Sequence, residues 1–264
     1  MFKKSMIRRA LLLTLITWLM ILGNLISSYG ADESTIKQLK EKLIIANKIL
    51  ELEKLATPFG HVSVRIPGTE TFLITRSVAP GMATLDDIVV CDLNGKVLEG
   101  KYKSTYSEVV IHTEVYKKRK DINSVVHTHS SYVIALSMTD NTVLPVNLTA
   151  LGIGPQPIAL FKKMVYIDTP ELGEEVCNLL GTNKAVILKG HGAMIVGKNI
   201  ESAMSTSRSL ENNAMLQWMA SCVGKLVPIT EQEKRMAIEF QQKVEQIGAG
   251  YQREWAYYES ILKK

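Results

Sequence analysis

The sequence contains only three cysteines, and it lacks internal repeats, low-complexity stretches and linker-like tracts. Cys91, Cys177 and Cys222 are odd in number and widely spaced, so they provide no disulfide framework. We expect them to be small core residues, and a single disulfide between two of them stays open. At 264 residues, 46% of them hydrophobic, the chain is long enough to bury a sizeable core.

The chain also lacks a basic run in which aromatic residues alternate with lysine and arginine. Its formal net charge is +5, but four of these positive charges lie within the first nine residues, which leaves about +1 for the remainder. A balance of this kind lacks the electrostatic footprint of a protein that binds nucleic acid. We therefore expect no nucleic-acid partner.

Residues 1–31 have the order of segments that is typical of a secretory signal peptide. Basic residues come first, a charge-free and largely apolar run from Ala10 to Ile26 follows, and small residues close the segment. We expect cleavage after Gly30 or Ala31 and export to the periplasm or the cell exterior. An uncleaved membrane anchor is the alternative, because about 17 apolar residues are at the lower limit for spanning a bilayer.

The rest of the chain, residues 32–264, is predicted to form one mixed α/β domain. Apolar residues at helical spacing alternate along the sequence with short β-branched runs, and the pairs Pro67-Gly68 and Asn94-Gly95 indicate hairpin turns. Interspersed strands and helices favour a layered domain. Predicted helices cover 33–55, 108–119, 132–138, 170–180, 200–223 and a last helix capped by Thr230–Glu233; predicted strands cover 61–65, 71–75, 88–92, 96–98, 123–127, 165–167, 185–188 and 193–196.

Two histidines one residue apart, His127 and His129, end the apolar run that begins at Ser124. Successive side chains of a strand point to opposite faces, so these two imidazoles project to the same side and can converge on one point. A third histidine, His191, lies between two glycines that have no side chain to obstruct a bound substrate. The three residues together predict a metal site, against the alternative of three unrelated core histidines.

Glu108 is the candidate proton-transfer group beside this metal site. Its place at the predicted start of a helix favours a negative charge, although a surface carboxylate would be favoured there as well. His112 lies four residues further on, and we expect it to have an outer or structural role. Three imidazoles and a carboxylate suit Zn²⁺, and they also accept Mn²⁺ or another first-row divalent ion.

Read together, Ser107-Glu108, His127-Thr-His129 and Leu188-Lys-Gly-His191-Gly resemble the class II aldolase/adducin family, of which L-fuculose-1-phosphate aldolase is a member. The resemblance spans about residues 39–227. It implies a three-layer α/β/α domain with a central, mainly antiparallel sheet, and a homotetramer with active sites between subunits. It also implies that the three histidines bind Zn²⁺ or a similar ion and that the glutamate acts as acid and base.

The substrate side departs from the phosphate-handling aldolases of that family. They carry Gly-Asn, a Thr-Gly turn and Ser-Ser-Glu where this chain has Gly60-His61, Ser77-Val78 and Tyr106-Ser107-Glu108. The motif Gly60-His-Val-Ser-Val-Arg65 is closer to a decarboxylase branch that includes 3-hydroxy-2-methylpyridine-4,5-dicarboxylate decarboxylase. We expect His61 to be a second base or a hydrogen-bond donor to the substrate. Arg76, and less so Arg65, is expected to hold a substrate carboxylate. The substrate should also contact Ser77, Tyr106 and Ser107.

The leading hypothesis is a divalent-metal-dependent carbon–carbon lyase, either a decarboxylase or an aldolase. A cation next to the scissile bond can accept charge as a stabilised enolate in either reaction, and Glu108 would move the proton. The substrate would be a small, non-phosphorylated hydroxy-carboxylate or keto acid. The alternatives are a sugar-phosphate aldolase of the fuculose-phosphate type and a non-catalytic, adducin-like binding or assembly protein.

Overall fold

The computed structural model describes residues 31–56, 58–139, 143–153, 158–227, 229–247 and 249–262. The predicted signal peptide lies outside these residues except for Ala31, so its cleavage and the export of the protein stay predictions. None of the helices within the described ranges is long and apolar enough to cross a membrane.

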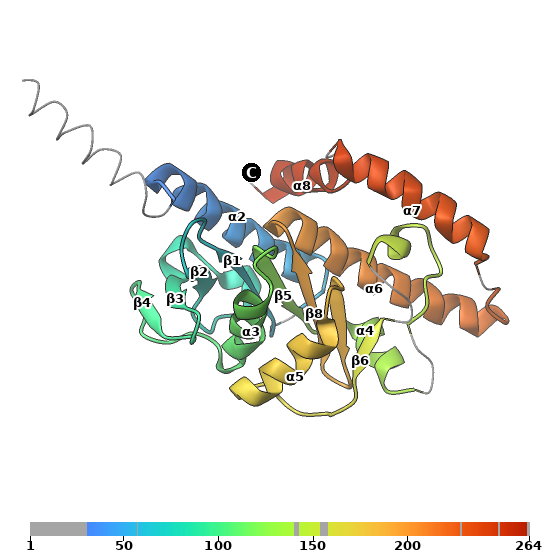
Figure 1. Ribbon diagram of the computed structural model, residues 1–264, viewed down its shortest axis with the longest axis horizontal. Coiled ribbons are helices and arrows are strands. Elements are labelled where there is room, and N and C mark those ends of the chain that lie inside the picture. The colour runs from blue at the N-terminus through green and yellow to red at the C-terminus, as the bar shows by residue number, and fades with distance from the viewer. Residues whose placement is uncertain are drawn as a thin grey trace, which may run out of the picture.

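A twisted sheet runs through the middle of the molecule (Figure 1). In the described part of the chain it contains eight strands, in the order β4-β3-β2-β1-β5-β8-β7-β6. Every pairing is antiparallel apart from the one between β6 and β7, which confirms the prediction of a mainly antiparallel sheet. The strands are β1 (His61–Arg65), β2 (Thr71–Thr75), β3 (Ile88–Asp92), β4 (Val97–Glu99), β5 (Ser124–Thr128), β6 (Ala159–Phe161), β7 (Ala185–Leu188) and β8 (Gly192–Gly197).

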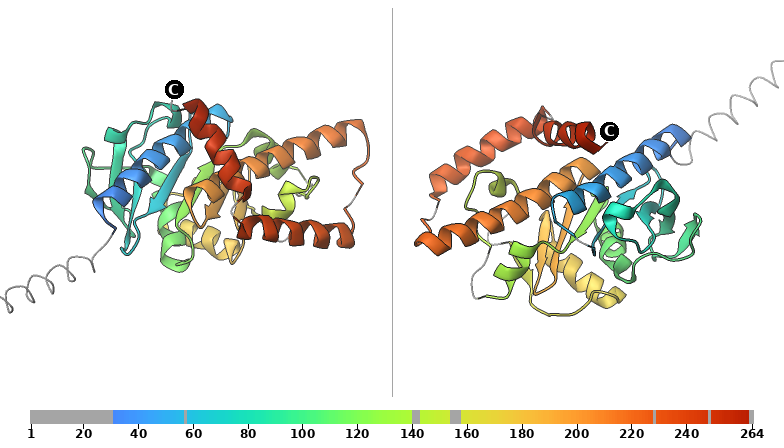
Figure 2. Two further views of the ribbon diagram at one scale, coloured as in Figure 1. Left: turned by 90° about the horizontal axis from the view of Figure 1, so that it is seen from above. Right: turned by 180° about the vertical axis from the view of Figure 1, so that it is seen from behind.

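Helices cover both faces of this sheet, as the two turned views show (Figure 2). One face packs against α2 (Glu33–Leu52), α4 (Ser131–Ser137), α6 (Ile200–Val223) and α8 (Ala249–Leu262), and the other packs against α3 (Val110–Lys118) and α5 (Pro170–Leu180). Neighbouring residues of a strand point to opposite faces of the sheet. On β5, for example, Val126 belongs to the first hydrophobic core and Val125 to the second. The predicted three-layer α/β/α arrangement is therefore confirmed.

Local signals account for several of the element boundaries. The Asp32 side chain accepts a hydrogen bond from the Thr35 backbone N–H and so caps α2. The turn between β3 and β4 uses Gly95 at a φ of +80°, a conformation in which glycine carries no steric penalty. Thr230 and Glu233 form the predicted reciprocal cap of α7 (Glu231–Gln246).

Three predicted elements differ from the structure. Residues 165–167 form no strand, and the edge strand lies earlier, at Ala159–Phe161. The predicted last helix is two helices, α7 and α8. The helix expected from Glu108 onward begins at Val110, and a short 3₁₀ turn, Ser107–Val109, precedes it.

Neither Thr105 nor Ser107, the two hydroxyl residues nearest its start, caps that helix. The Thr105 hydroxyl instead donates a hydrogen bond to the backbone oxygen of Thr75 on β2, and no side chain caps the 3₁₀ turn. The start of this segment is therefore set by its attachment to the sheet rather than by a local cap.

Candidate active site

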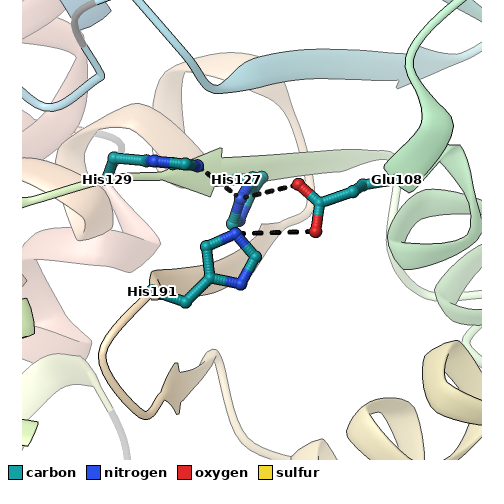
Figure 3. Close-up of side chains that lie close together, drawn as sticks. All are labelled: Glu108, His127, His129 and His191. Carbon is teal, nitrogen blue, oxygen red and sulfur yellow. Dashed lines mark hydrogen bonds and ion pairs between the residues drawn. The ribbon is translucent and has the colours of Figure 1, made fainter. Parts of the chain in front are cut away.

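The predicted metal-binding residues converge at one end of the central strands. His127 lies on β5 and His129 just beyond it, while His191 occupies the tight turn that joins β7 to β8. Glu108 reaches the same point from the 3₁₀ turn before α3, as the close-up shows (Figure 3). One ligand atom from each of the four residues lies within 4.8 Å of the others.

The turn that carries His191 approaches β5 closely. Gly190 adopts a φ of +63°, which closes the turn, and Gly192 pairs with Leu188 where β8 begins. A Cβ atom on Gly192 would lie 1.8 Å from the backbone oxygen of Thr128, so this position accepts only glycine without movement of β5. The two glycines thereby let His191 face the His127–His129 pair.

A backbone carbonyl fixes the orientation of the His127 ring. Its Nδ1 lies 3.1 Å from the oxygen of Ala193, which can only accept a hydrogen bond, so Nδ1 carries the hydrogen. Burial lowers the pKa of His127 well below its usual range, and the ring is therefore neutral. Its bare Nε2 consequently points at the cluster, 2.9 Å from Nε2 of His129 and 3.6 Å from Oε2 of Glu108.

The carboxylate of Glu108 faces that bare nitrogen of His127. Its Oε1 accepts a hydrogen bond of 2.8 Å from the Ile167 backbone N–H and lies 3.5 Å from Nε2 of His191. Burial by itself would raise the pKa of Glu108, but the neighbouring imidazoles and the Ile167 N–H hold it at about 2. The carboxylate is thus ionised at neutral pH.

The donor set fits a divalent cation. A lone pair on His127 and a carboxylate oxygen on Glu108 face one another with no hydrogen between them, which is unfavourable unless a positive charge lies there. Both ring nitrogens of His191 are buried and have no hydrogen-bond partner among the described residues. Burial lowers the pKa of His129 to about 4, so it also offers a neutral nitrogen ligand.

A cavity of about 820 Å³ opens onto this cluster. Five of the predicted substrate-side or catalytic residues line it together with His129 and His191, namely His61, Ser77, Tyr106, Ser107 and Glu108. Its remaining wall includes Phe59, Met164 and Tyr166, which sequence reasoning did not single out.

Arg76 does not line the cavity, although the sequence suggested it as a carboxylate-binding residue. Its Nε donates to Oδ1 of Asp87 at 2.6 Å, and its guanidinium lies 4.6 Å from the centre of the Tyr102 ring. Arg65 is buried and donates to the backbone oxygens of Ile122 and Tyr116. In the described structure both guanidinium groups are therefore occupied within the chain, and their contact with a substrate stays a prediction.

Comparison with known proteins identifies the family. Residues 41–218 match the class II aldolase and adducin N-terminal domain, which is more than half of the chain. The chain belongs to the class II aldolase and adducin family. This confirms the resemblance carried by the motifs at Glu108, at His127 and His129, and at His191.

Relatives within this family include both aldolases and decarboxylases. The chain is 33% identical over 165 residues to an L-fuculose phosphate aldolase of Methanococcus maripaludis, covering 61% of this chain and 84% of that protein. It is 28% identical over 199 residues to a 3,4-dihydroxyphthalate decarboxylase of Arthrobacter keyseri, covering 70% and 79%. The crystal structure of an aldolase II superfamily protein from Pseudomonas syringae superposes with a TM-score of 0.76 at 25% identity, covering 86% and 92%.

These findings make the chain a lyase that acts on a small molecule. The family uses a divalent metal, and the cluster of Glu108 with three histidines is the group in the described residues that can hold one. Both aldolases and decarboxylases occur among its relatives, so the family alone does not select the reaction.

Proposed function

We propose that this class II aldolase family member is a divalent-metal-dependent carbon–carbon lyase for a small, non-phosphorylated hydroxy-carboxylate or keto acid. The observation that supports this proposal is the cavity onto which the cluster of Glu108 and the three histidines opens. Among the described residues, no lysine or arginine lines that cavity. A phosphate group carries up to two negative charges and is usually met by cationic side chains or a row of backbone N–H groups.

His127, His129 and His191 would hold the cation, and we propose Zn²⁺ or Mn²⁺. When bound, such a cation polarises a substrate oxygen and stabilises the negative charge that develops as a carbon–carbon bond breaks. The cavity is large enough for a small organic acid, and Phe59 and Met164 give it an apolar side.

Glu108 is the proton-transfer group in this proposal. Its carboxylate is anchored by the Ile167 N–H through Oε1, which leaves Oε2 directed toward His127 and the open cavity. An ionised carboxylate at this position can take a proton from a substrate hydroxyl, as aldol cleavage requires. After decarboxylation, the same group once protonated can return a proton to carbon.

Metal content tests the assembly of the site. We expect wild-type protein to contain about one equivalent of divalent metal and the double variant His127→Ala with His129→Ala to contain almost none. Ser207→Ala is the matched control, because Ser207 is a buried polar residue on α6 whose hydroxyl, among the described residues, donates to the Ala203 backbone oxygen. Retention of metal by the double variant would show that the ligands are misassigned.

A parallel activity screen tests the reaction and the substrate class. Release of CO₂ or aldehyde would be measured with non-phosphorylated hydroxy acids and keto acids, and with phosphorylated ketoses such as L-fuculose 1-phosphate. Turnover restricted to the phosphorylated compounds would favour the alternative sugar-phosphate aldolase. We expect Glu108→Gln to lower kcat by about 10²- to 10⁴-fold, and unchanged turnover would exclude it as the acid or base.

We also propose that the enzyme is exported and forms a homo-oligomer, for which a tetramer is our expectation. The N-terminal pattern of residues 1–31 supports export. Side chains at the mouth of the cavity support self-association, because Phe59, Met164 and Tyr166 are all more than half exposed. Cell fractionation and sedimentation of the purified protein would test the two statements separately.

A further inference from the structure

A row of buried polar side chains crosses the layer between β1 and α3 and ends at the wall of the cavity. The Tyr116 hydroxyl lies 2.7 Å from Oγ of Ser63, and the same Oγ lies 2.6 Å from Nδ1 of His112. Nε2 of His112 in turn lies 2.6 Å from Nδ1 of His61. All four residues are at most 2% exposed, so this relay is separated from solvent along its length.

The relay follows from the alternation of β1. His61 and Ser63 point to the α3 face, whereas Val62 and Val64 between and beyond them pack into the opposite core. His112 and Tyr116 are four residues apart on α3 and therefore share one side of that helix. Four polar groups thus meet in a layer whose other members are mainly apolar.

The number of hydrogens available fixes the direction of the relay. Among the described residues, Ser63 Oγ is the sole hydrogen-bond acceptor for the Tyr116 hydroxyl, so Tyr116 donates and Ser63 accepts. Ser63 then donates its single hydrogen to Nδ1 of His112. The reverse direction would leave the Tyr116 hydroxyl hydrogen buried and unpaired, which is the costly arrangement.

The two imidazoles continue this direction. With Nδ1 accepting from Ser63, neutral His112 carries its hydrogen on Nε2 and donates it to Nδ1 of His61. Because Nδ1 of each ring accepts a hydrogen bond, each ring can carry its own hydrogen only on Nε2. Neutral His61 must then carry its hydrogen on Nε2.

His61 is in contact with the residues of the site. Its ring centre lies 4.3 Å from that of Tyr106 and 5.1 Å from that of His127, and it forms part of the cavity wall. No acceptor for its Nε2 hydrogen is recorded within the described part of the chain, whereas its Nδ1 is occupied by His112.

We infer that His61 is held as a fixed Nε2–H hydrogen-bond donor for an oxygen of the substrate, and that His112, Ser63 and Tyr116 are positioning residues that set its tautomer. Of the two roles open from the sequence, a second base or a substrate donor, this arrangement selects the donor. The ligand class is an oxygen acceptor next to the cation, such as a carboxylate or carbonyl oxygen. The identity of the acceptor as a substrate oxygen rests on the proposed function, whereas the tautomer of His61 does not.

Nitrogen-15 NMR of histidine-labelled, Zn²⁺-loaded protein tests the tautomer without any turnover. We expect His61 to be protonated on Nε2 and bare on Nδ1. In Ser63→Ala, Nδ1 of His112 loses its donor, and a water molecule in the vacated space can donate or accept there, so a mixture of tautomers is expected at His112 and His61, whereas Ser207→Ala should keep the wild-type spectrum. A proton on Nδ1 of His61 in the wild-type protein, or an unchanged tautomer in Ser63→Ala, would overturn the inference.

Binding of glycolate, a small hydroxy-carboxylate probe, tests the donor. A glutamine amide nitrogen can reach about the position of Nε2, whereas phenylalanine has no donor. We expect the Kd of glycolate for the Zn²⁺-loaded protein to rise about tenfold in His61→Phe and less than threefold in His61→Gln. Equal affinity of all three proteins would refute the donor role, while a correct tautomer with no lyase activity would refute only the proposed function.

Discussion

Replacement of Gly192 by alanine should damage the metal site without touching any of its ligands. Gly192 has a φ of +153°, which L side chains rarely adopt, and an added Cβ would lie 1.8 Å from the oxygen and 2.9 Å from the carbon of Thr128. The next closest atom is the Cα of His129, at 3.2 Å. The clash therefore falls on the backbone between His127, on β5, and His129, just beyond it.

The cost of this substitution follows from two terms. Relief of the clash requires β5 and the start of β8 to separate, and overpacking of this kind costs about 1 to 3 kcal/mol. The strained backbone conformation adds about 1 to 3 kcal/mol. We expect the free energy of unfolding to fall by about 2 to 6 kcal/mol and the affinity for Zn²⁺ to fall by about 10- to 100-fold, as for other changes that displace a ligand.

Urea denaturation of the metal-free protein and calorimetric titration with Zn²⁺ measure these two effects separately. Gly224→Ala is the matched control, because Gly224 has an extended backbone and no atom within 4 Å of an added Cβ. We expect that control to change the unfolding free energy by no more than about 0.5 kcal/mol. If Gly192→Ala matched the control in both measurements, the close approach of β8 to β5 would not matter for the site.

Three further predictions concern residues around the site. The folded-state pKa of His112 is about 3, well below its unfolded value, so the protein should be most stable above about pH 6.5. Below that pH the free energy of unfolding should fall by up to about 1.4 kcal/mol per pH unit, which urea unfolding of the metal-free protein at pH 7.0 and 5.5 would measure. Equal stability at both pH values would show that His112 is accessible to protons in the folded state. The Glu211 carboxylate accepts hydrogen bonds from the backbone N–H groups of Tyr132 and Val133 at the start of α4. Glu211→Ala should therefore lower the free energy of unfolding by about 1.5 to 3 kcal/mol and speed hydrogen exchange of these two amides. Unchanged exchange rates would contradict this. Burial by itself would raise the pKa of Asp87, but hydrogen bonds from Thr84 and Arg76 lower this pKa overall. The ionised carboxylate therefore stabilises the fold above about pH 4, and this stabilisation is lost as the pH falls through the folded-state pKa. Asp87→Asn should flatten the acid side of the plot of unfolding free energy against pH, and a plot parallel to that of the wild-type protein would contradict this.

Most of the sheet and the convergence of the candidate metal ligands could be predicted because their signals are local. Alternating residues on β1 and β2 and the Asn94-Gly95 turn define strands over a few positions, and His127 and His129 share a face by the period of the strand. The glycines on either side of His191 similarly indicated a tight turn. In each case the physical cause lies within a few residues of the feature that it explains.

Tertiary contacts explain the places where prediction failed. The run Val165–Ile167 has a strand-like composition, but its Ile167 N–H binds Glu108 and its first two residues line the cavity, so it pairs with no strand. The pairing of Arg76 with Asp87, eleven residues later, likewise gives no sign in the sequence, and the contact of Arg76 with a substrate stays a prediction. Glu108 has φ and ψ of −85° and 20° in a 3₁₀ turn, which helical spacing could not reveal.

The position of β5 in the sheet has a kinetic consequence. Val125 pairs with Ser63, 62 residues earlier, and with Val196, 71 residues later, so β5 is completed only after two long loops of chain have closed. Chains dominated by such distant pairings fold slowly, because the entropy of loop closure is lost before the contacts form. The cation's ligands come together at the same late stage. A bound cation should therefore leave the refolding rate almost unchanged and slow the rate of unfolding, which stopped-flow measurements with Zn²⁺ and with a chelator would distinguish.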